Sequence, residues 1–244
     1  MAKRYDFVVM IPTYNRRGLL ELALQQLVPA AEDAGISVYH LIFDDCSTDL
    51  GYTDMLATYK RDFYEINYFR AFTRYGRGGF CSLYTKMMEM IKPLDFAYVI
   101  ATADDLIFAS NFFIKAADHF EVRKREDASI VAMNLLWNKK GRSWGFTRYI
   151  DCGFICVREF FDAIEWKVPS RKKRVFNNPH TSTGVGMYMT KTLFNHPYYS
   201  VAENDGISLQ EIRKSHGGVK IQSVMRPWHT NWSPKQAATW NELR

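Results

Sequence analysis

The stretch Val99-Ile-Ala-Thr-Ala-Asp-Asp-Leu-Ile-Phe108 contains an apolar run that ends in two adjacent carboxylates. Such a run predicts a buried strand, and ligands of open α/β sheets bind beyond the carboxyl ends of the strands. Two neighbouring carboxylates repel each other, and desolvation strengthens the repulsion, so a cation usually accompanies the pair. Oxygen ligands on a short turn suit Mg2+ or Mn2+. An isolated Asp-Asp pair is also typical of a solvated turn before a helix. The rest of the sequence decides between a metal site and such a turn.

Apolar runs alternate with helical patterns along the first half of the chain. Strands are predicted at residues 6–12, 38–43, 66–69 and 96–101, and helices at residues 18–28, 52–59 and 82–91, with a glycine-rich loop at 74–79. The next predicted elements are a helix over 111–121 that Ser110 caps, a charged turn at 123–127, and strands at 130–136 and 151–157. This alternation predicts an α/β fold with a mostly parallel central sheet and helices on both faces.

Composition bounds the class of protein. The chain has 244 residues, of which 47% are hydrophobic, enough for one large α/β domain or two small ones. No apolar run has the length of a membrane span, and the first residues lack a signal-peptide segment, so a soluble, intracellular protein is expected. The four cysteines form no Cys-x-x-Cys pair and are expected to be reduced. The net charge of +6 is compatible with an anionic partner.

Three predicted strands of the first half end in polar residues. Thr13-Tyr-Asn15 follow the first strand, Asp44-Asp45 follow the second, and Asp104-Asp105 follow the fourth. Parallel strands of one sheet bring such ends together at one edge. We therefore expect these side chains to share a site.

These segments resemble the inverting, nucleotide-sugar-dependent glycosyltransferases of family 2, which have the GT-A fold. The matching stretches are Val8-Val-Met-Ile-Pro-Thr-Tyr-Asn15, Phe43-Asp-Asp-Cys-Ser-Thr-Asp49 and Ala101-Thr-Ala-Asp-Asp105. The resemblance implies one GT-A-like domain over residues 1–244. Its nucleotide-sugar-binding half would be residues 1–125, and residues 126–244 would be the acceptor-binding half that carries the catalytic base.

The resemblance also implies which residues hold the donor, a nucleoside-diphosphate sugar and by expectation a UDP-sugar. In that family the loop after the first strand and the acids after the second hold the base and the ribose. Here those roles would fall to Pro12, Thr13, Tyr14, Asn15, Asp44 and Asp45. Arg77, in the glycine-rich loop, is a further expected donor contact, although a solvated turn residue fits the same position.

A divalent ion, Mn2+ or Mg2+, is implied for the acids after the fourth strand. The family's metal element also touches the ribose, so Asp104 is expected to contact the donor, and Asp104 and Asp105 are expected to hold the ion. Thr102 stands where many members have the first acid, which leaves open which carboxylate binds the metal. His229 is a further candidate ligand, because several GT-A enzymes complete the metal shell with a C-terminal histidine.

Inverting transfer also needs a base that takes the proton of the acceptor hydroxyl. The family places this acid in a late Glu-Asp motif that opens a helix, and Glu203-Asn-Asp205 resembles that motif with one residue inserted. Asp205 is the predicted base and Glu203 the second candidate. A carboxylate that only caps the following helix is the alternative interpretation.

Two kinds of acceptor remain open. Basic segments and the aromatic content favour a phage-type enzyme that modifies a hydroxymethylated base in DNA, in the cytoplasm of a bacterium or of a phage-infected host. Flipping such a base would need aromatic side chains to stack on it. The candidate acceptor contacts are Arg171, Lys172, Lys173, Arg174 and Trp228. The other acceptor is a cell-envelope polysaccharide or a lipid-linked sugar. A non-catalytic protein that binds sugar nucleotides or nucleic acid is the alternative from another class.

Overall fold

The structure, a computed structural model, describes residues 3–104, 106, 108–135, 150, 153–168, 189, 193 and 196–202. The strands are β1 (Arg4–Thr13), β2 (Val38–Asp44), β3 (Tyr64–Arg70), β4 (Asp95–Ala101), β5 (Ile130–Asn134), β6 (Phe154–Cys156) and β7 (Ser200–Val201). The helices are α1 (Arg17–Ala34), α2 (Tyr52–Ala57), α3 (Gly76–Ile91), α4 (Phe112–Glu126) and α5 (Arg158–Ala163).

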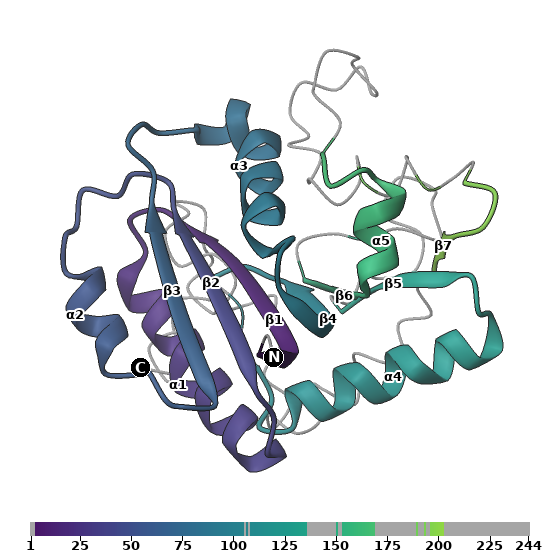
Figure 1. Cartoon of the computed structure of the whole chain (residues 1–244). Helices are drawn as coiled ribbons and strands as arrows, with labels where there is room; N and C mark the ends of the chain where they lie inside the picture. Colours follow the sequence, from purple (N-terminus) through teal and green to yellow (C-terminus); the bar gives the residue numbers. More distant parts are fainter. Residues whose placement is uncertain are drawn as a thin grey trace, which may run out of the picture.

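The strands form one seven-stranded sheet in the order β3-β2-β1-β4-β6-β5-β7 (Figure 1). β1 pairs in parallel with β2 and β4, and β2 pairs in parallel with β3. β6 runs antiparallel to β4 and β5, and β7 is parallel to β5. The predicted mostly parallel α/β sheet is therefore confirmed, with β6 as the antiparallel strand.

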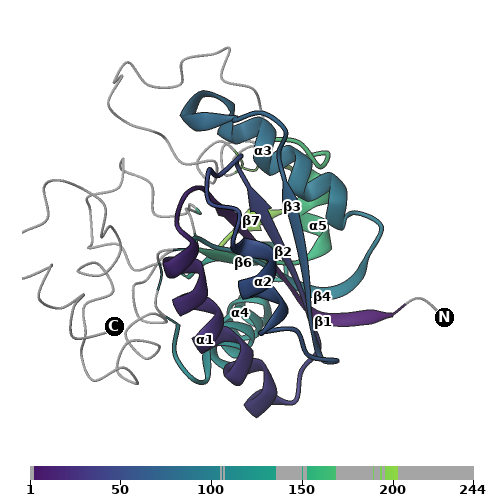
Figure 2. The same ribbon diagram turned by 90° about the vertical axis from the view of Figure 1, so that its left-hand side faces the viewer.

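Helices cover both faces of this sheet. Figure 2 shows α1 and α4 on one side of the sheet and α3 and α5 on the other. The predicted arrangement of helices on both faces is thus confirmed. Within the described part of the chain, no helix is long and apolar enough to cross a membrane.

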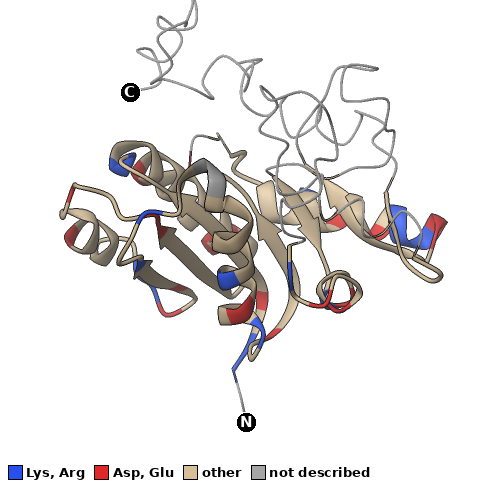
Figure 3. Cartoon of the chain, turned by 90° about the horizontal axis from the view of Figure 1, so that it is seen from above, with Lys and Arg blue, Asp and Glu red and all other residues tan. Residues whose placement is uncertain are grey.

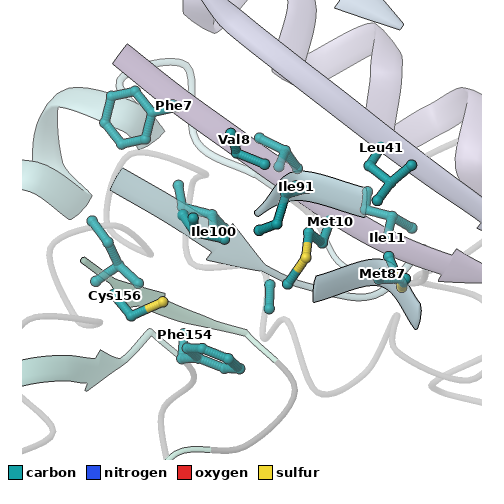
Figure 4. Packing of buried hydrophobic residues seen from close by; sticks show 14 of the residues in the cluster. Phe7, Val8, Met10, Ile11, Leu41, Met87, Ile91, Ile100, Phe154 and Cys156 are labelled. Carbon is teal, nitrogen blue, oxygen red and sulfur yellow. The ribbon is translucent and has the colours of Figure 1, made fainter. Parts of the chain in front are cut away.

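The core lies around the interior strand β1, whose residues Val8, Val9, Met10 and Ile11 have no exposed surface. A strand that is covered on both faces reads as a continuous apolar run rather than an alternating one, which explains this segment of the sequence. In Figure 4, Met87 of α3 lies close to β1. Each fully buried aliphatic side chain of this kind contributes about 1.5–3 kcal/mol to the free energy of folding.

Helix α1 continues beyond the residue at which the sequence predicts its end. The prediction stops at residue 28, before Pro29, yet α1 runs to Ala34 with Pro29 inside it. Ala30 and Ala31 are buried, so packing against the core outweighs the hydrogen bond that the proline ring removes. The helix ends at Gly35, which has φ +64°.

Three other predicted boundaries are wrong. The glycine-rich segment predicted as a loop contains the first turn of α3, which begins at Gly76 and not at residue 82. The N-cap position of α4 is Asn111 rather than Ser110, and its side chain makes no capping hydrogen bond. α4 also includes most of the predicted charged turn, because Arg123 and the two basic residues after it form its last turn, where cations are favourable.

Candidate functional site

The four residues that follow the body of β1, Thr13 to Arg16, contact the ends of three other strands. Their partners lie after β2, after β3 and after β4. All these ends lie at the carboxyl edge of the parallel part of the sheet. This loop therefore connects the strand ends that the sequence predicted to lie close together.

Thr13 and Arg16 bind the carboxylate of Asp104. The Thr13 hydroxyl donates to Asp104 Oδ2 at 2.7 Å, and Arg16 Nη1 donates to Oδ1 at 3.1 Å. The Asp104 side chain is 3% exposed, whereas the Arg16 side chain is 34% exposed. A buried carboxylate is costly unless it is paired and hydrogen-bonded, and these two donors supply both. The structure thus brings together two predicted donor-site residues, Thr13 and Asp104, and adds Arg16.

Asn15 fastens this loop to the segment after β2. Its backbone N–H donates to Ser47 Oγ at 2.8 Å, and its side-chain Oδ1 accepts the Thr48 N–H at 2.8 Å. Asn15 has φ +50°, a conformation that asparagine tolerates better than most residues. The predicted Asn15 is therefore a residue that shapes the loop.

Asp44 is fully buried and holds the turn after β2. Its Oδ1 accepts the Ser47 N–H at 2.9 Å, and its Oδ2 accepts the Tyr68 hydroxyl at 2.6 Å. Arg70 Nε lies 3.7 Å from Oδ2, because the parallel register sets Arg70 opposite Asp44. Burial, followed by the hydrogen bond to Asp44, raises the pKa of Tyr68. In this structure both oxygens of Asp44 face protein groups.

Asp45 binds the beginning of α3. Its two carboxylate oxygens accept the backbone N–H groups of Tyr75 and Gly76, the latter at 2.9 Å. A carboxylate at a helix N-terminus satisfies N–H groups that have no partner inside the helix and favours the helix dipole. The Asp45 N–H in turn donates to the Thr13 carbonyl at 2.8 Å. The two adjacent acids after β2 thus have different contacts: Asp44 stabilises its own turn, and Asp45 binds the beginning of α3.

Tyr14 completes the loop's contacts. The Arg74 guanidinium lies 3.9 Å from the centre of the Tyr14 ring, in the segment between β3 and α3. Tyr14 is half-buried and Arg74 is exposed. An aromatic face and a guanidinium at the same edge suit a planar, negatively charged ligand such as a nucleotide. Pro12 lies buried in β1, opposite Phe43 of β2.

The segment that follows β4 carries two oxygen groups of the kind that hard divalent ions prefer. They are the Asp104 carboxylate and the hydroxyl of Thr102, which is 1% exposed and has no hydrogen-bond partner among the described residues. Such donors suit Mg2+ or Mn2+ rather than a soft metal. The described residues contain no cluster of three or more His, Cys, Asp or Glu side chains that would hold a metal by itself.

Several predicted residues lie outside the described part of the chain, so their roles remain predictions. They are Asp105, Arg171, Lys172, Lys173, Arg174, Glu203, Asp205, Trp228 and His229. The backbone of Arg77 lies in the first turn of α3, and its side chain is outside the description.

Sequence reasoning missed four residues that build this site: Arg16, Ser47, Tyr68 and Arg70. A signal existed for two of them. Arg16 follows the Thr13-Tyr-Asn15 segment directly, and the parallel pairing of β2 with β3 sets Arg70 opposite Asp44. The contacts of Ser47 and Tyr68 depend on side-chain packing, which the sequence pattern does not give.

The chain shares its fold with glycosyltransferases of known structure. The mannosyltransferase PcManGT from Pyrobaculum calidifontis, in complex with GDP-Man and Mn2+, has a TM-score of 0.57 and 14% identity. That match covers 83% of this chain, which spans only 56% of the mannosyltransferase chain. S. aureus TarS 1-349 in complex with UDP-GlcNAc has a TM-score of 0.53 and 14% identity, covering 98% of this chain and 71% of its own.

The uncomplexed TarS 1-349 structure gives a TM-score of 0.55 at 13% identity, covering 98% of this chain and 78% of its own. No protein-family model and no curated protein matches the sequence. These structural similarities confirm the GT-A-like fold that the sequence predicted.

Proposed function

We propose that this chain is a glycosyltransferase that binds a nucleoside-diphosphate sugar at the carboxyl edge of β1, β2 and β4. The observation that carries the proposal is the position of Thr13. Its carbonyl accepts the Asp45 N–H at 2.8 Å, and its hydroxyl donates to Asp104 at 2.7 Å, so one residue joins three strand ends. The fold supports the proposal, because structures of the same fold are complexes with GDP-Man and UDP-GlcNAc.

The chemistry of the edge suits the diphosphate of such a donor. The N-terminus of α1 begins at Arg17, directly after the site loop, and the N-terminus of a helix favours anions. Arg16 adds a positive charge at the same place. Asp104, with Asp105 as the second predicted ligand, would hold a divalent ion, which stabilises negative charge on a leaving nucleoside diphosphate. Tyr14 and Arg74, which lie against each other, would together contact one side of the base.

Transfer with inversion needs a base at the acceptor hydroxyl, and we assign this role to Asp205, with Glu203 as the second candidate. The assignment rests on the sequence motif. Asp205→Asn is expected to retain donor binding and to lose transfer, whereas Glu203→Gln retains both in part. Unchanged transfer by Asp205→Asn would overturn the assignment.

Donor binding is tested by calorimetry with UDP, GDP and a panel of their sugars, with and without Mn2+. The unaltered chain is expected to bind one nucleotide class, and Asp104→Asn is expected to weaken that binding at least about tenfold by removing a charged contact. The control is Asp49→Asn, an exposed carboxylate that pairs with Arg17. A chain that folds and binds no nucleotide would contradict the proposed function.

For the acceptor, the finer proposal is a hydroxymethylated base in DNA. Its support is the basic sequence Arg171-Lys-Lys-Arg174, which lies outside the described residues. In the described part, both basic and acidic residues are scattered over helices and loops (Figure 3). Incubating the chain with labelled nucleotide sugars and hydroxymethylated DNA is expected to label the DNA, with binding that weakens steeply as salt rises. Labelling of an envelope saccharide or lipid-linked sugar instead would overturn the DNA acceptor and keep the glycosyltransferase.

A further inference from the structure

Asp104 already has a cationic partner from within the chain, at the position where a divalent ion is expected. Arg16 Nη1 donates to Oδ1 at 3.1 Å, and Thr13 Oγ1 donates to Oδ2 at 2.7 Å. The Asp104 side chain is only 3% exposed. A carboxylate buried to this degree needs a compensating charge, and Arg16 provides it. Arg16 is therefore the counterion of Asp104 in this structure.

The backbone of Arg16 is held by hydrogen bonds that do not involve its guanidinium. The Arg16 backbone N–H donates to the Tyr52 hydroxyl at 2.9 Å. Its carbonyl accepts the N–H groups of Leu19 and Leu20 at 3.1 and 3.0 Å. The side chain itself is 34% exposed, so water reaches part of it. A long side chain thus extends from a fixed main chain.

A divalent ion and Arg16 would compete for the same carboxylate. Mg2+ binds carboxylate oxygens at about 2.1 Å, so an ion on Asp104 would lie within a few ångströms of the guanidinium and repel it. An Asp104 oxygen that coordinates the ion is less available to the Arg16 guanidinium, and the two positive charges repel each other. An ion on Asp104 therefore weakens the contact between Arg16 and Asp104.

We propose that Arg16 is a resident cation of this site that a divalent ion displaces, so that Arg16 sets the metal affinity of the free protein. The displaced guanidinium then lies beside the diphosphate of the donor, and this second consequence rests on the proposed function. Removing the charge of Arg16 should therefore act in opposite directions on the two ligands. It strengthens metal binding to the free protein and weakens nucleotide binding to the metal-loaded protein.

The test measures Mn2+ binding to the full chain, without nucleotide, by electron paramagnetic resonance of the unbound ion. Arg16→Gln is expected to bind Mn2+ at least about tenfold more tightly, the smallest change that one nearby unit charge makes in the proton affinity of a carboxylate. Arg16→Lys retains the charge and should stay close to the unaltered chain. Arg17→Gln is the matched control, because the neighbouring Arg17 pairs with Asp49. Asp104→Asn should lose the binding.

Equal or weaker Mn2+ binding by folded Arg16→Gln overturns the proposal, and so does Mn2+ binding that Asp104→Asn leaves unchanged. A second measurement uses the unaltered chain, in case Arg16→Gln does not fold. The Arg16 Nε–H resonance, assigned with Arg16→Lys, should shift on titration with Mg2+ while the Arg17 resonance does not. An Arg16 resonance that stays unmoved at saturating Mg2+ overturns the proposal as well.

UDP and GDP binding at saturating Mn2+ separates this proposal from the proposed function. Arg16→Gln is expected to bind the preferred nucleotide at least about tenfold more weakly, as expected for the loss of one charge-assisted contact. Tighter nucleotide binding by this variant would overturn the second consequence. If the unaltered chain binds neither nucleotide, the proposed function fails, and the Mn2+ result still decides the role of Arg16.

Discussion

Asp44 and Asp45 are neighbours in the sequence, yet at the residue scale they hold different parts of the site. Asp44 Oδ2 accepts the Tyr68 hydroxyl at 2.6 Å, and its Oδ1 accepts the Ser47 N–H at 2.9 Å. Asp45 instead binds the N–H groups that begin α3. An apolar strand that ends in two acids therefore locates the end of the strand, but it does not tell which part of the structure each acid contacts.

Asp44→Asn should lower the free energy of unfolding by about 2–4 kcal/mol, because it removes the charge that the donors around a fully buried carboxylate share. Asp49→Asn is the control, since Asp49 is 40% exposed and its ion pair with Arg17 is screened by water. Denaturant unfolding of both variants measures the difference. Equal stability of the two variants would show that Asp44 does not hold the turn.

Thr13→Val tests the hydroxyl that joins β1 to Asp104. Valine has nearly the same shape but donates no hydrogen bond, so Asp104 loses its 2.7 Å contact. We expect the free energy of unfolding to fall by about 1.5–3 kcal/mol, the contribution of a hydrogen bond to a charged group. Thr13→Ser retains the hydroxyl and should recover most of this stability in the same denaturant titration. A serine variant as unstable as the valine variant would mean that the methyl group, not the hydroxyl, matters.

The sequence predicted much of the site at this scale, because strand ends can be located from apolar runs. Thr13 and Asp104 are in direct contact, as expected from their positions after β1 and β4. Arg16 directly follows the predicted Thr13-Tyr-Asn15 segment, but that position alone does not tell which carboxylate its guanidinium contacts. Contacts set by a long, flexible side chain follow from packing and not from periodicity.

At the scale of elements, strands were predicted better than helix ends. β2 and β4 lie within one residue of their predicted bounds, since buried strands are short apolar runs with polar ends. Helix α1 passes through Pro29, because two buried alanines keep the chain on the core. The two-residue strand β7 was not predicted, because two residues are too few to show an alternation of apolar and polar side chains.

Two glycines, one at each end of α1, give a matched pair of variants. Gly35 has φ +64°, and its N–H and that of Ile36 bond the last helical carbonyls, at Glu32 and Ala31. Gly35→Ala should destabilise the chain by about 1 kcal/mol, because alanine pays for the left-handed conformation although nothing lies within 4 Å of its Cβ. Gly18→Ala, inside the same helix, should stabilise it by about 0.5 kcal/mol. Thermal unfolding measures both shifts, and shifts of the same sign would contradict the argument.

At the scale of the whole molecule, one buried histidine links the central sheet to pH. His40 of β2 is fully buried, and burial lowers its pKa to about 3. Its Nδ1 lies 2.9 Å from the Tyr64 hydroxyl on β3, and its Nε2 has no hydrogen-bond partner among the described residues. The folded chain therefore keeps this imidazole neutral over most of the acid range, between two strands that every unfolding event must separate.

The unfolded chain protonates the same histidine near pH 6.5. Between pH 6.5 and about 3 the unfolded state therefore holds one more proton at His40, so its contribution to stability is complete above pH 6.5 and is lost as the pH falls toward 3. His40→Gln cannot be protonated, and its free energy of unfolding should fall less steeply over this window, by up to about 1.4 kcal/mol per pH unit. Urea unfolding of both proteins from pH 7 to pH 4 measures the two slopes, in which the carboxylates common to both cancel. Parallel slopes would mean that the folded chain admits the proton and that His40 is not enclosed as the structure describes.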